Sequence, residues 1–383
     1  MCISEFLKKN LLLKVIVSLA IFVFVSVSCS PSYRPFGLVF SANLDGNQDL
    51  YRVYSHDFQS LERLTHTSSD REQKLRLSRD DTKILYTVLG EYLGWDTYVL
   101  DLNSNKITSL ENPDLGLRSI QALTWSSDGN IAVLLEKQKR KIYLLNLDQK
   151  NVEELDIPQT FDGSIITAAD YSPDGKKIIY TEYQDSSPQV SISTPFIFNF
   201  ETNEVAFLVE NNNEICIEPK WSSDGQKILT YCFITTTSSS YSIEGHVYLL
   251  GVKDYDPIVV NKVADLPCGY QIFWSPKAKY AWAPDGKQFV TAYCQMGDVP
   301  LSLAVFDSEG NLEGSFPVLE STQNEIFVTE MVWSPDSKKI IYIAGESENK
   351  LNIYMINPDG SSRELLTNQS ANYEELNVFG LDT

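Results

Sequence analysis

One five-residue phrase recurs along this chain and constrains its fold more than any other feature. The phrase combines an aromatic residue, Ser or Ala, a small residue, Asp, and Gly or Ser. Its copies occupy residues 125–129, 171–175, 221–225, 282–286 and 333–337, with a degenerate copy at 77–81. Successive copies begin 46 to 61 residues apart. A period of this length indicates that one supersecondary unit is repeated many times along the chain.

Each copy of the phrase is followed by a short apolar run, and the two together indicate a β-hairpin. In the phrase, Asp can accept hydrogen bonds from the backbone ahead of it, and Gly can adopt a positive φ. The following runs are β-branched or aromatic and lack the helical period, which is typical of strands. They occupy residues 83–86, 177–180, 227–230 and 339–342. Because a second hairpin follows each run, every repeat is expected to supply four antiparallel strands.

The two ends of the repeat array are both incomplete, and they complement one another. Residues 37–40 provide a second strand without a first, and residues 376–380 provide an apolar run without a successor. Pairing the two would close a ring and hide the edges of an open array. We therefore predict an all-β fold, a seven-bladed β-propeller of four-stranded antiparallel blades, closed by N-terminal strands pairing with a C-terminal strand. Six or eight blades are the less favoured alternatives.

The repeats also resemble a known family. Residues 40–51 and 353–360, together with the Ser-Pro-Asp-Gly turns, are similar to the WD40-like PD40 repeat. That repeat is found in TolB-type periplasmic proteins and in propellers attached to prolyl-oligopeptidase and tricorn-type peptidases. The resemblance covers residues 37–381 and implies a propeller, but it rests on turn and core positions, so it names no ligand. This chain departs from TolB-like proteins in two expected features: the absence of a separate α/β domain and a count of seven blades rather than six.

The N-terminal segment has the layout of a secretory signal. Lys8, Lys9 and Lys14 accompany an apolar stretch over residues 15–27, and small residues precede Cys29. Residues 25–29 resemble a bacterial lipobox, in which Cys29 would be acylated. We expect a signal peptide at 1–28, a linker at 29–36 and a single propeller at 37–383, in an exported, membrane-anchored lipoprotein of the periplasm or cell surface. An uncleaved anchor and an ordinary signal peptide are the alternatives.

Four cysteines outside the N-terminal segment are candidates for disulfides in an exported chain. Cys216 and Cys232 each lie eight residues from Asp224 at a turn centre, which would place them opposite each other across a hairpin. Cys268 and Cys294 flank the inserted segment of the following repeat and could pair in the same way. Other pairings and buried free thiols remain open, and no spacing typical of a zinc site is present.

The charge balance and the histidines limit the chemistry that the chain can perform. The net charge of −20 disfavours nucleic acid as a partner and fits either a soluble exported protein or a cationic partner. The three histidines belong to no motif, and no Gly-x-Ser-x-Gly sequence occurs. We therefore predict no catalytic residues and no cofactor. A Ca²⁺ site at residues 45–49, or at Asp80 and Asp81 with Glu91 and Asp96, is weighed against ordinary turns, and the turns are favoured.

The links between second and third strands differ in length, and long loops on a rigid scaffold often carry function. Their aromatic side chains are candidates for partner contacts: Tyr92, Trp95, Tyr183 and Tyr241. We predict a non-enzymatic, envelope-anchored binding scaffold that engages a protein or a cell-envelope polymer through this face. The alternative is a propeller enzyme, a lyase or hydrolase acting on carbohydrate or peptide through carboxylates of the central funnel. A further alternative is that these loops are solvated tips that bind no partner. The sequence does not indicate an oligomeric state.

Overall fold

The computed structural model describes residues 35–381 with gaps. The gaps are 68–70, 90–94, 112–116, 118, 137–140, 158–163, 188–189, 209–214, 235–243, 254–255, 267–279, 296–297, 320–325, 348 and 368. Residues 35–383 form one compact unit, and its regular elements in the described part are β-strands. Within the described residues, no helix has the length and apolar character needed to cross a membrane.

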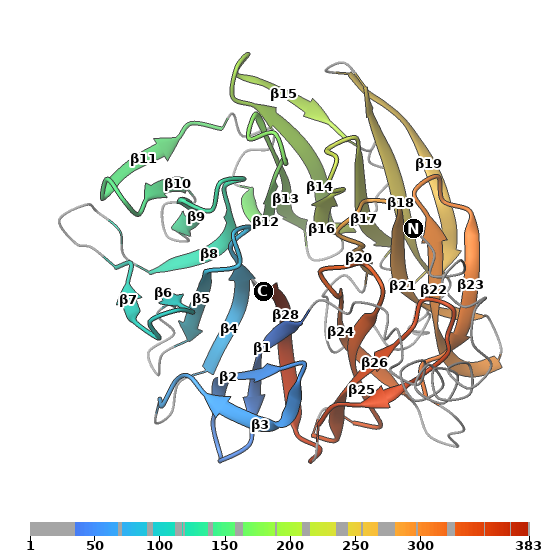
Figure 1. Cartoon of the computed structure of the whole chain (residues 1–383). Helices are drawn as coiled ribbons and strands as arrows, with labels where there is room; N and C mark the ends of the chain where they lie inside the picture. The colour runs from blue at the N-terminus through green and yellow to red at the C-terminus, as the bar shows by residue number, and fades with distance from the viewer. Residues whose placement is uncertain are drawn as a thin grey trace, which may run out of the picture. The chain divides into compact units, whose positions relative to one another are not determined.

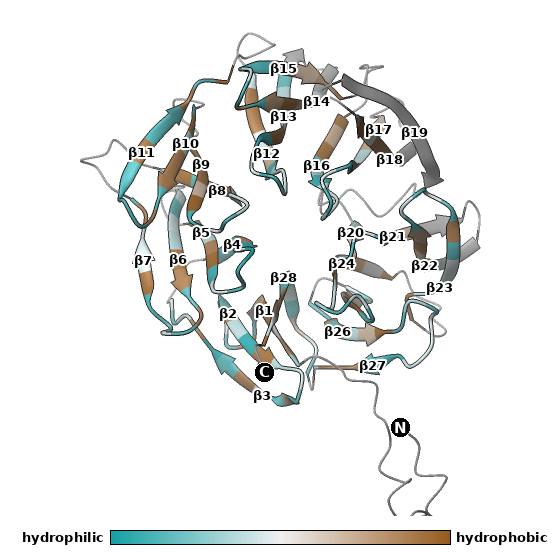
Figure 2. Ribbon diagram, turned by 45° about the horizontal axis from the view of Figure 1, so that its top comes forward, coloured by the Kyte–Doolittle hydropathy of each residue, from teal (hydrophilic) through white to brown (hydrophobic). Residues whose placement is uncertain are grey.

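The described strands pair into seven antiparallel sets of four, here called blades 1 to 7, which are arranged in a ring (Figure 1). The first strand of each blade lies nearest the axis (Figure 2). Blade 1 contains, from the inside outwards, β28 (Asn372–Gly380), β1 (Phe36–Asn43), β2 (Gln48–Tyr54) and β3 (Asp57–Arg63). Blade 2 contains β4 (Arg71–Leu77), β5 (Lys83–Leu89), β6 (Trp95–Asp101) and β7 (Ile107–Ser109). Blade 3 contains β8 (Ile120–Trp125), β9 (Ile131–Glu136), β10 (Lys141–Asn146) and β11 (Asn151–Leu155).

The remaining blades follow in chain order around the ring. Blade 4 contains β12 (Ile165–Tyr171), β13 (Lys177–Ser187), β14 (Val190–Asn199) and β15 (Glu204–Phe207). Blade 5 contains β16 (Ile215–Trp221), β17 (Lys227–Ile234), β18 (Glu244–Lys253) and β19 (Asp256–Leu266). Blade 6 contains β20 (Tyr280–Trp282), β21 (Gln288–Gln295), β22 (Asp298–Asp307) and β23 (Leu312–Pro317). Blade 7 contains β24 (Phe327–Trp333), β25 (Ile340–Gly345), β26 (Leu351–Ile356) and β27 (Glu364–Leu365). The propeller class predicted from the repeats is confirmed.

Blade 1 closes the ring by combining the two ends of the propeller. The C-terminal strand β28 pairs antiparallel with β1, from Phe36 opposite Gly380 to Asn43 opposite Asn372. The contact is tight because a Cβ on Gly37 would lie only 2.0 Å from the ring of Phe379. Phe379 is buried, so the absence of a side chain at Gly37 makes room for it. The predicted closure by N-terminal and C-terminal strands is confirmed.

The repeated phrase forms the turn between the first and second strand of a blade. In blade 3, the Ser126 hydroxyl donates to Asp128 Oδ1 at 2.5 Å and accepts the Ile131 amide at 3.0 Å. The hydrogen bond from Ser126 holds the pKa of Asp128 below its usual value. Ser78, Ser172, Ser222 and Ser334 repeat this arrangement. These turns lie on one face of the ring, the turn face, and the links from second to third strands lie on the opposite loop face.

Substitution of Ser172 by Ala is expected to destabilise the propeller by about 2 kcal/mol, because it removes a buried hydroxyl and leaves a partly buried backbone donor without this acceptor. The Ser172 hydroxyl donates to Asp174 and accepts the Lys177 amide at 2.9 Å. Urea denaturation measures the change. Ser361 is the control: its hydroxyl donates to Asp359, two residues before it, but lies exposed, so Ser361→Ala should cost far less. Equal effects of the two substitutions would contradict the role given to the buried turn.

Tryptophans of the phrase join neighbouring blades beside the axis. Trp125 Nε1 donates to the Arg76 carbonyl at 2.7 Å, from blade 3 to blade 2. Trp333 Nε1 donates to the Ala281 carbonyl at 3.0 Å, from blade 7 to blade 6. The accepting residue in each case directly precedes the phrase of the preceding blade. These bonds position the strands nearest the axis and therefore the side chains that they present to the centre of the ring.

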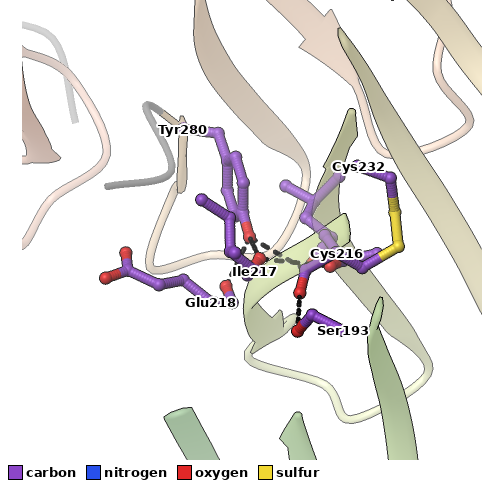
Figure 3. Close-up of a disulfide and its surroundings, with 8 residues drawn as sticks. Ser193, Cys216, Ile217, Glu218, Cys232 and Tyr280 are labelled. Atoms are coloured by element: carbon purple, nitrogen blue, oxygen red, sulfur yellow. Dashed lines mark hydrogen bonds between the residues drawn. A yellow bond between two sulfur atoms is a disulfide. The ribbon is translucent and has the colours of Figure 1, made fainter. Parts of the chain in front are cut away.

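A disulfide joins the first two strands of blade 5 (Figure 3). Cys216 on β16 lies opposite Cys232 on β17, and both side chains are buried. The pairing expected from their equal distance to Asp224 is therefore present. Cys268 lies outside the described residues. Cys294 lies within β21, but its side chain is not described, so the second expected disulfide stays a prediction.

Candidate functional site

The strands nearest the axis carry bulges that place charged residues at the centre of the ring. The register shifts between Gln73 and Arg76 on β4 and between Ile217 and Lys220 on β16. Within these bulges and at the matching place on β28, three residues have a left-handed backbone: Lys74 with φ 56°, Glu218 with φ 47° and Glu375 with φ 55°. Such conformations cost roughly 1 kcal/mol or more for residues other than Gly, and bulges often reorient side chains at functional sites.

Several of these strands line a central cavity, here called the channel, with a volume of about 730 Å³. Strands β4, β16, β20, β24 and β28 provide its wall. The charged lining residues are Lys74, Arg76, Glu218, Lys220, Glu330, Glu374 and Glu375. The aromatic lining residues are Trp221, Tyr280 and Trp282. Asn372, the first residue of β28, also lines the channel and marks its end at the loop face.

Two cations of the channel wall pair with acidic side chains of neighbouring blades. Arg76 on β4 lies 3.8 Å from Glu375 on β28 and donates through Nε to the Leu123 carbonyl at 3.1 Å. Lys220 on β16 lies 3.7 Å from Asp170 on β12, and Asp170 also accepts the Trp221 amide at 2.9 Å. The wall is therefore polar and carries both signs of charge, and these contacts hold its side chains in defined positions.

Tyr280 connects blade 6 to the bulge of blade 5. Its hydroxyl donates to the Glu218 carbonyl and lies 3.4 Å from the carbonyl oxygen of Ile217 (Figure 3). Ile217 is the residue that follows Cys216. The Glu218 carboxylate points away from both Tyr280 and the disulfide. Burial raises the pKa of Tyr280 well above its usual value, so the phenol stays protonated and acts as a donor. The disulfide, the bulge and Tyr280 thus form one structural unit in the channel wall.

The residues proposed for partner contacts are only partly described. Trp95 begins β6 in blade 2, and Tyr183 lies on β13 opposite Ile165 in blade 4, both at the loop face. Blade 3 lies between them, so the structure does not bring these two side chains together. Tyr92, Tyr241 and the lipidation candidate Cys29 lie outside the described residues. The role of all these positions in binding stays a prediction.

The channel residues were not singled out from the sequence, although a signal for them exists. Lys74, Glu218 and Glu330 each stand three residues before the first residue of a phrase copy. The signal is a charged residue three positions before the phrase, within a segment that otherwise has the composition of a strand. It indicates a side chain that lines the channel. The pattern could not show that the strand bulges there, because a bulge depends on the register with the neighbouring strand.

The segment considered for Ca²⁺ holds an arginine instead. The Arg63 guanidinium lies 3.3 Å from both Asp45 Oδ2 and Asn47 Oδ1 and donates to Asp49 Oδ2. Gly46 has φ 105°, and its amide donates to Asn43 Oδ1 at 3.1 Å, as expected of the favoured turn. Among the described residues, no three His, Cys, Asp or Glu side chains gather as metal ligands would. Glu91, part of the second segment considered for Ca²⁺, lies outside them.

The strand sets and the channel define the class of protein, a β-propeller with a polar central channel. No family model and no curated protein matches the sequence. The chain is similar in structure to an oligogalacturonate lyase in complex with manganese, with 14% identity, coverage of 86% of this chain and 84% of that one, and a TM-score of 0.57. A putative 6-phosphogluconolactonase from Bacteroides fragilis shows 13% identity, coverage of 92% and 99%, and a TM-score of 0.54.

A TolB from Acinetobacter baumannii is also similar, with 18% identity, coverage of 78% of this chain and 67% of that one, and a TM-score of 0.49. At these identities, likeness to the solved structures shows the fold alone. The two solved structures with the higher TM-scores support the fold expected from the repeats, and their descriptions differ from one another.

Proposed function

We propose that this protein is a non-enzymatic binding scaffold of the cell envelope, which engages a protein or an envelope polymer. The loop face and the channel, whose lining includes Asn372 at that face, would form the binding surface. The observation that carries the proposal is the polar wall of the channel, in which Arg76 and Lys220 are held by acidic partners from neighbouring blades. Fixed groups of both signs offer complementary contacts to a polar chain, and such complementarity determines which partner binds.

The place of the protein in the cell is part of this proposal. The basic start, apolar stretch and Cys29 of the N-terminal segment favour export and acylation. An acyl chain contributes about 0.8 kcal/mol of membrane affinity for each buried methylene group. The scaffold would thus act on the extracytoplasmic side, in the periplasm or at the cell surface.

An enzyme of carbohydrate or peptide cleavage is the second candidate, and one observation favours it. Glu218, Glu330 and Glu374 line the same channel, where paired carboxylates could serve as general acid and base. Two similar solved structures are described as a lyase of oligogalacturonate and a putative lactonase. Such a protein would release products from a panel of glycans or peptides, whereas a scaffold would bind a ligand without changing it.

Site-specific photo-crosslinking in cells that produce the protein tests the proposal. A photoreactive residue placed at Glu374 in the channel, or at Tyr183 on the loop face, should yield adducts with one defined protein or polymer. Leu312, which is 60% exposed on outer strand β23, provides the control position and should yield none of that adduct. Adducts at Leu312 alone, or turnover of a panel substrate that is lost in Glu330→Gln, would overturn the scaffold proposal.

A further inference from the structure

Two carboxyl groups are buried together at the junction of blades 1 and 2. Asp49 on β2 and Glu72 on β4 are both 0% exposed. Thr67, which follows β3, lies between them: its hydroxyl oxygen is 3.3 Å from Asp49 Oδ1 and 3.1 Å from Glu72 Oε1. The same hydroxyl accepts a hydrogen bond from Asn47 Nδ2 at 3.1 Å. One hydroxyl group therefore connects two acidic side chains that have no contact with solvent.

The hydrogen-bond donors around the two groups are unequal. Asp49 receives the Arg63 guanidinium, the Thr65 hydroxyl at 3.2 Å and the Thr67 amide at 3.1 Å. Glu72 receives weaker support, from the Thr67 and Thr65 hydroxyls and its own backbone amide, and its Oε2 has no hydrogen-bond partner among the described residues. A buried carboxylate needs several donors or a cation to remain ionised. Asp49 has several donors and the Arg63 cation, whereas Glu72 forms no ion pair within the described part of the chain.

Counting protons around Thr67 leads to the same assignment. A hydroxyl has one hydrogen to donate and two lone pairs with which to accept. If Thr67 donates to Asp49, its lone pairs accept Asn47 Nδ2 and a proton from Glu72, and every short contact is then a hydrogen bond. With both carboxyl groups ionised, one of the two contacts to Thr67 would join an acceptor to an acceptor. A neutral Glu72 resolves this conflict.

We propose that Glu72 holds a proton in the folded protein, and that its loss weakens the junction between blades 1 and 2, which makes this junction a pH-sensitive joint of the propeller. The proposal does not depend on the proposed function.

One hydrogen bond of Glu72 and the backbone pair of the residue before it tie β4 to the blade that closes the ring. The Glu72 carbonyl accepts the Ser41 hydroxyl of β1 at 3.0 Å, and that hydroxyl accepts Gln48 Nε2 of β2 at 2.8 Å. Gln48 also forms the single parallel pair with Arg71, the residue before Glu72. If Glu72 loses its proton, a buried negative charge lies beside the Gln48–Arg71 pair. In the described sheet, this is the one backbone pair that joins the two blades. The channel residues 73–76 follow directly on the same strand.

Several titratable groups surround Glu72, and among them the charge of Asp49 favours its neutral form. From β2 come the Asp49 carboxylate and the Tyr51 phenol, from β5 the Tyr86 phenol, and from β28 Glu374, which lies opposite Ser41. Arg63 of β3 is a cation beside these groups, and it pairs with Asp49. Burial, with a contribution from the charge of Asp49, raises the pKa of Glu72 to about 7.

The direction of the pH effect follows from this assignment. The unfolded chain releases the proton of Glu72 near the ordinary value of 4.5, while the folded chain holds it to about 7. The folded state therefore binds more protons between these values, so stability falls as the pH rises through that window and the loss is complete above it. Between pH 5 and pH 8, the unfolding equilibrium constant of the wild type should rise by a factor about 100 times larger than that of Glu72→Gln, which carries no ionisable group at this position.

Two measurements on the full chain test the proposal. Denaturation at pH 5 and at pH 8 should show the larger decrease for the wild type, and Glu153→Gln, at an exposed position of β11, should follow the wild type. NMR titration with ¹³C-labelled Glu carboxyl groups should show one group that titrates near pH 7 and disappears in Glu72→Gln. After correction for the intrinsic pH dependence of amide exchange, the protection of Gln48 and Arg71 should fall above that pH in the wild type alone.

The NMR titration needs only the wild type, so it decides the matter even if Glu72→Gln fails to fold. Thr67→Val, which removes the shared hydroxyl, provides a second variant and should shift the titration of the same carboxyl group. A spectrum in which every Glu carboxyl group titrates below pH 5 would overturn the proposal. The proposal would also be overturned if the wild type and Glu72→Gln lost the same amount of stability between pH 5 and pH 8.

Discussion

Removal of residues 372–383 is expected to abolish cooperative folding of the whole propeller. This truncation deletes β28, the first strand of blade 1 and the partner of β1. Tyr373, Leu376 and Phe379 of this strand are buried, and each contributes roughly 2 kcal/mol of apolar burial. Their loss, together with the broken β1 pairing, is comparable with the entire net stability of an ordinary domain, about 5–15 kcal/mol. Circular dichroism during heating and limited proteolysis would measure the result.

The control for this truncation removes only residues 382 and 383, which leaves β28 complete, and it should melt like the full chain. Addition of a synthetic peptide with the sequence of residues 372–383 should partly restore the melting transition of the truncated protein, since the peptide can occupy the vacant place beside β1. A truncated protein that melts at the temperature of the intact one would contradict the closure of the ring through blade 1.

Loss of the Cys216–Cys232 disulfide is expected to cost about 3 kcal/mol of unfolding free energy, the entropic value for a closed loop of about 15 residues. The two cysteines are 16 residues apart in the chain. The double variant Cys216→Ala/Cys232→Ala should therefore unfold at a lower urea concentration. Because the bulge at Glu218 and the Tyr280 hydrogen bond lie beside Cys216, hydrogen exchange should accelerate there more than in blade 2.

Chemical reduction separates the cross-link from the packing of the sulfur atoms. Reduced wild type keeps both side chains but loses the bond, so it should be destabilised about as much as the double variant. Treatment of the double variant with reductant measures any contribution from the other cysteines. If the double variant alone were destabilised, the effect would belong to side-chain packing, and the role of the disulfide would be refuted.

The elements that sequence reasoning predicted well are those set by local chemistry. Ser126, Asp128 and Gly129 form the expected turn because each residue type meets a requirement of that turn, for a hydroxyl, an acceptor or a positive φ. The closing pair of strands was predictable because residues 37–40 and 376–380 each lacked a partner. Cys216 and Cys232 were predictable because equal distances from a turn centre place two residues opposite each other.

The channel and the buried acidic pair depend on contacts that local chemistry does not determine. The positive φ values of Lys74, Glu218 and Glu375 arise from bulges, and a bulge exists only relative to a partner strand. Glu72 looks like an ordinary charged residue at a strand end. Glu72 is buried because Asp49 and Thr67 pack against β4. This contact depends on how blades 1 and 2 are aligned with each other.

The hydrogen bond from the Leu381 amide to the Pro35 carbonyl, 3.1 Å long, places the two ends of the propeller side by side. Because β1 and β28 run antiparallel, a force that pulls these ends apart acts on one residue pair at a time. Under tension the β1–β28 pair would therefore separate one residue pair after another, starting beside Leu381, because its hydrogen bonds would not share the load. The strand pair that completes the circle would then be its mechanically weakest point.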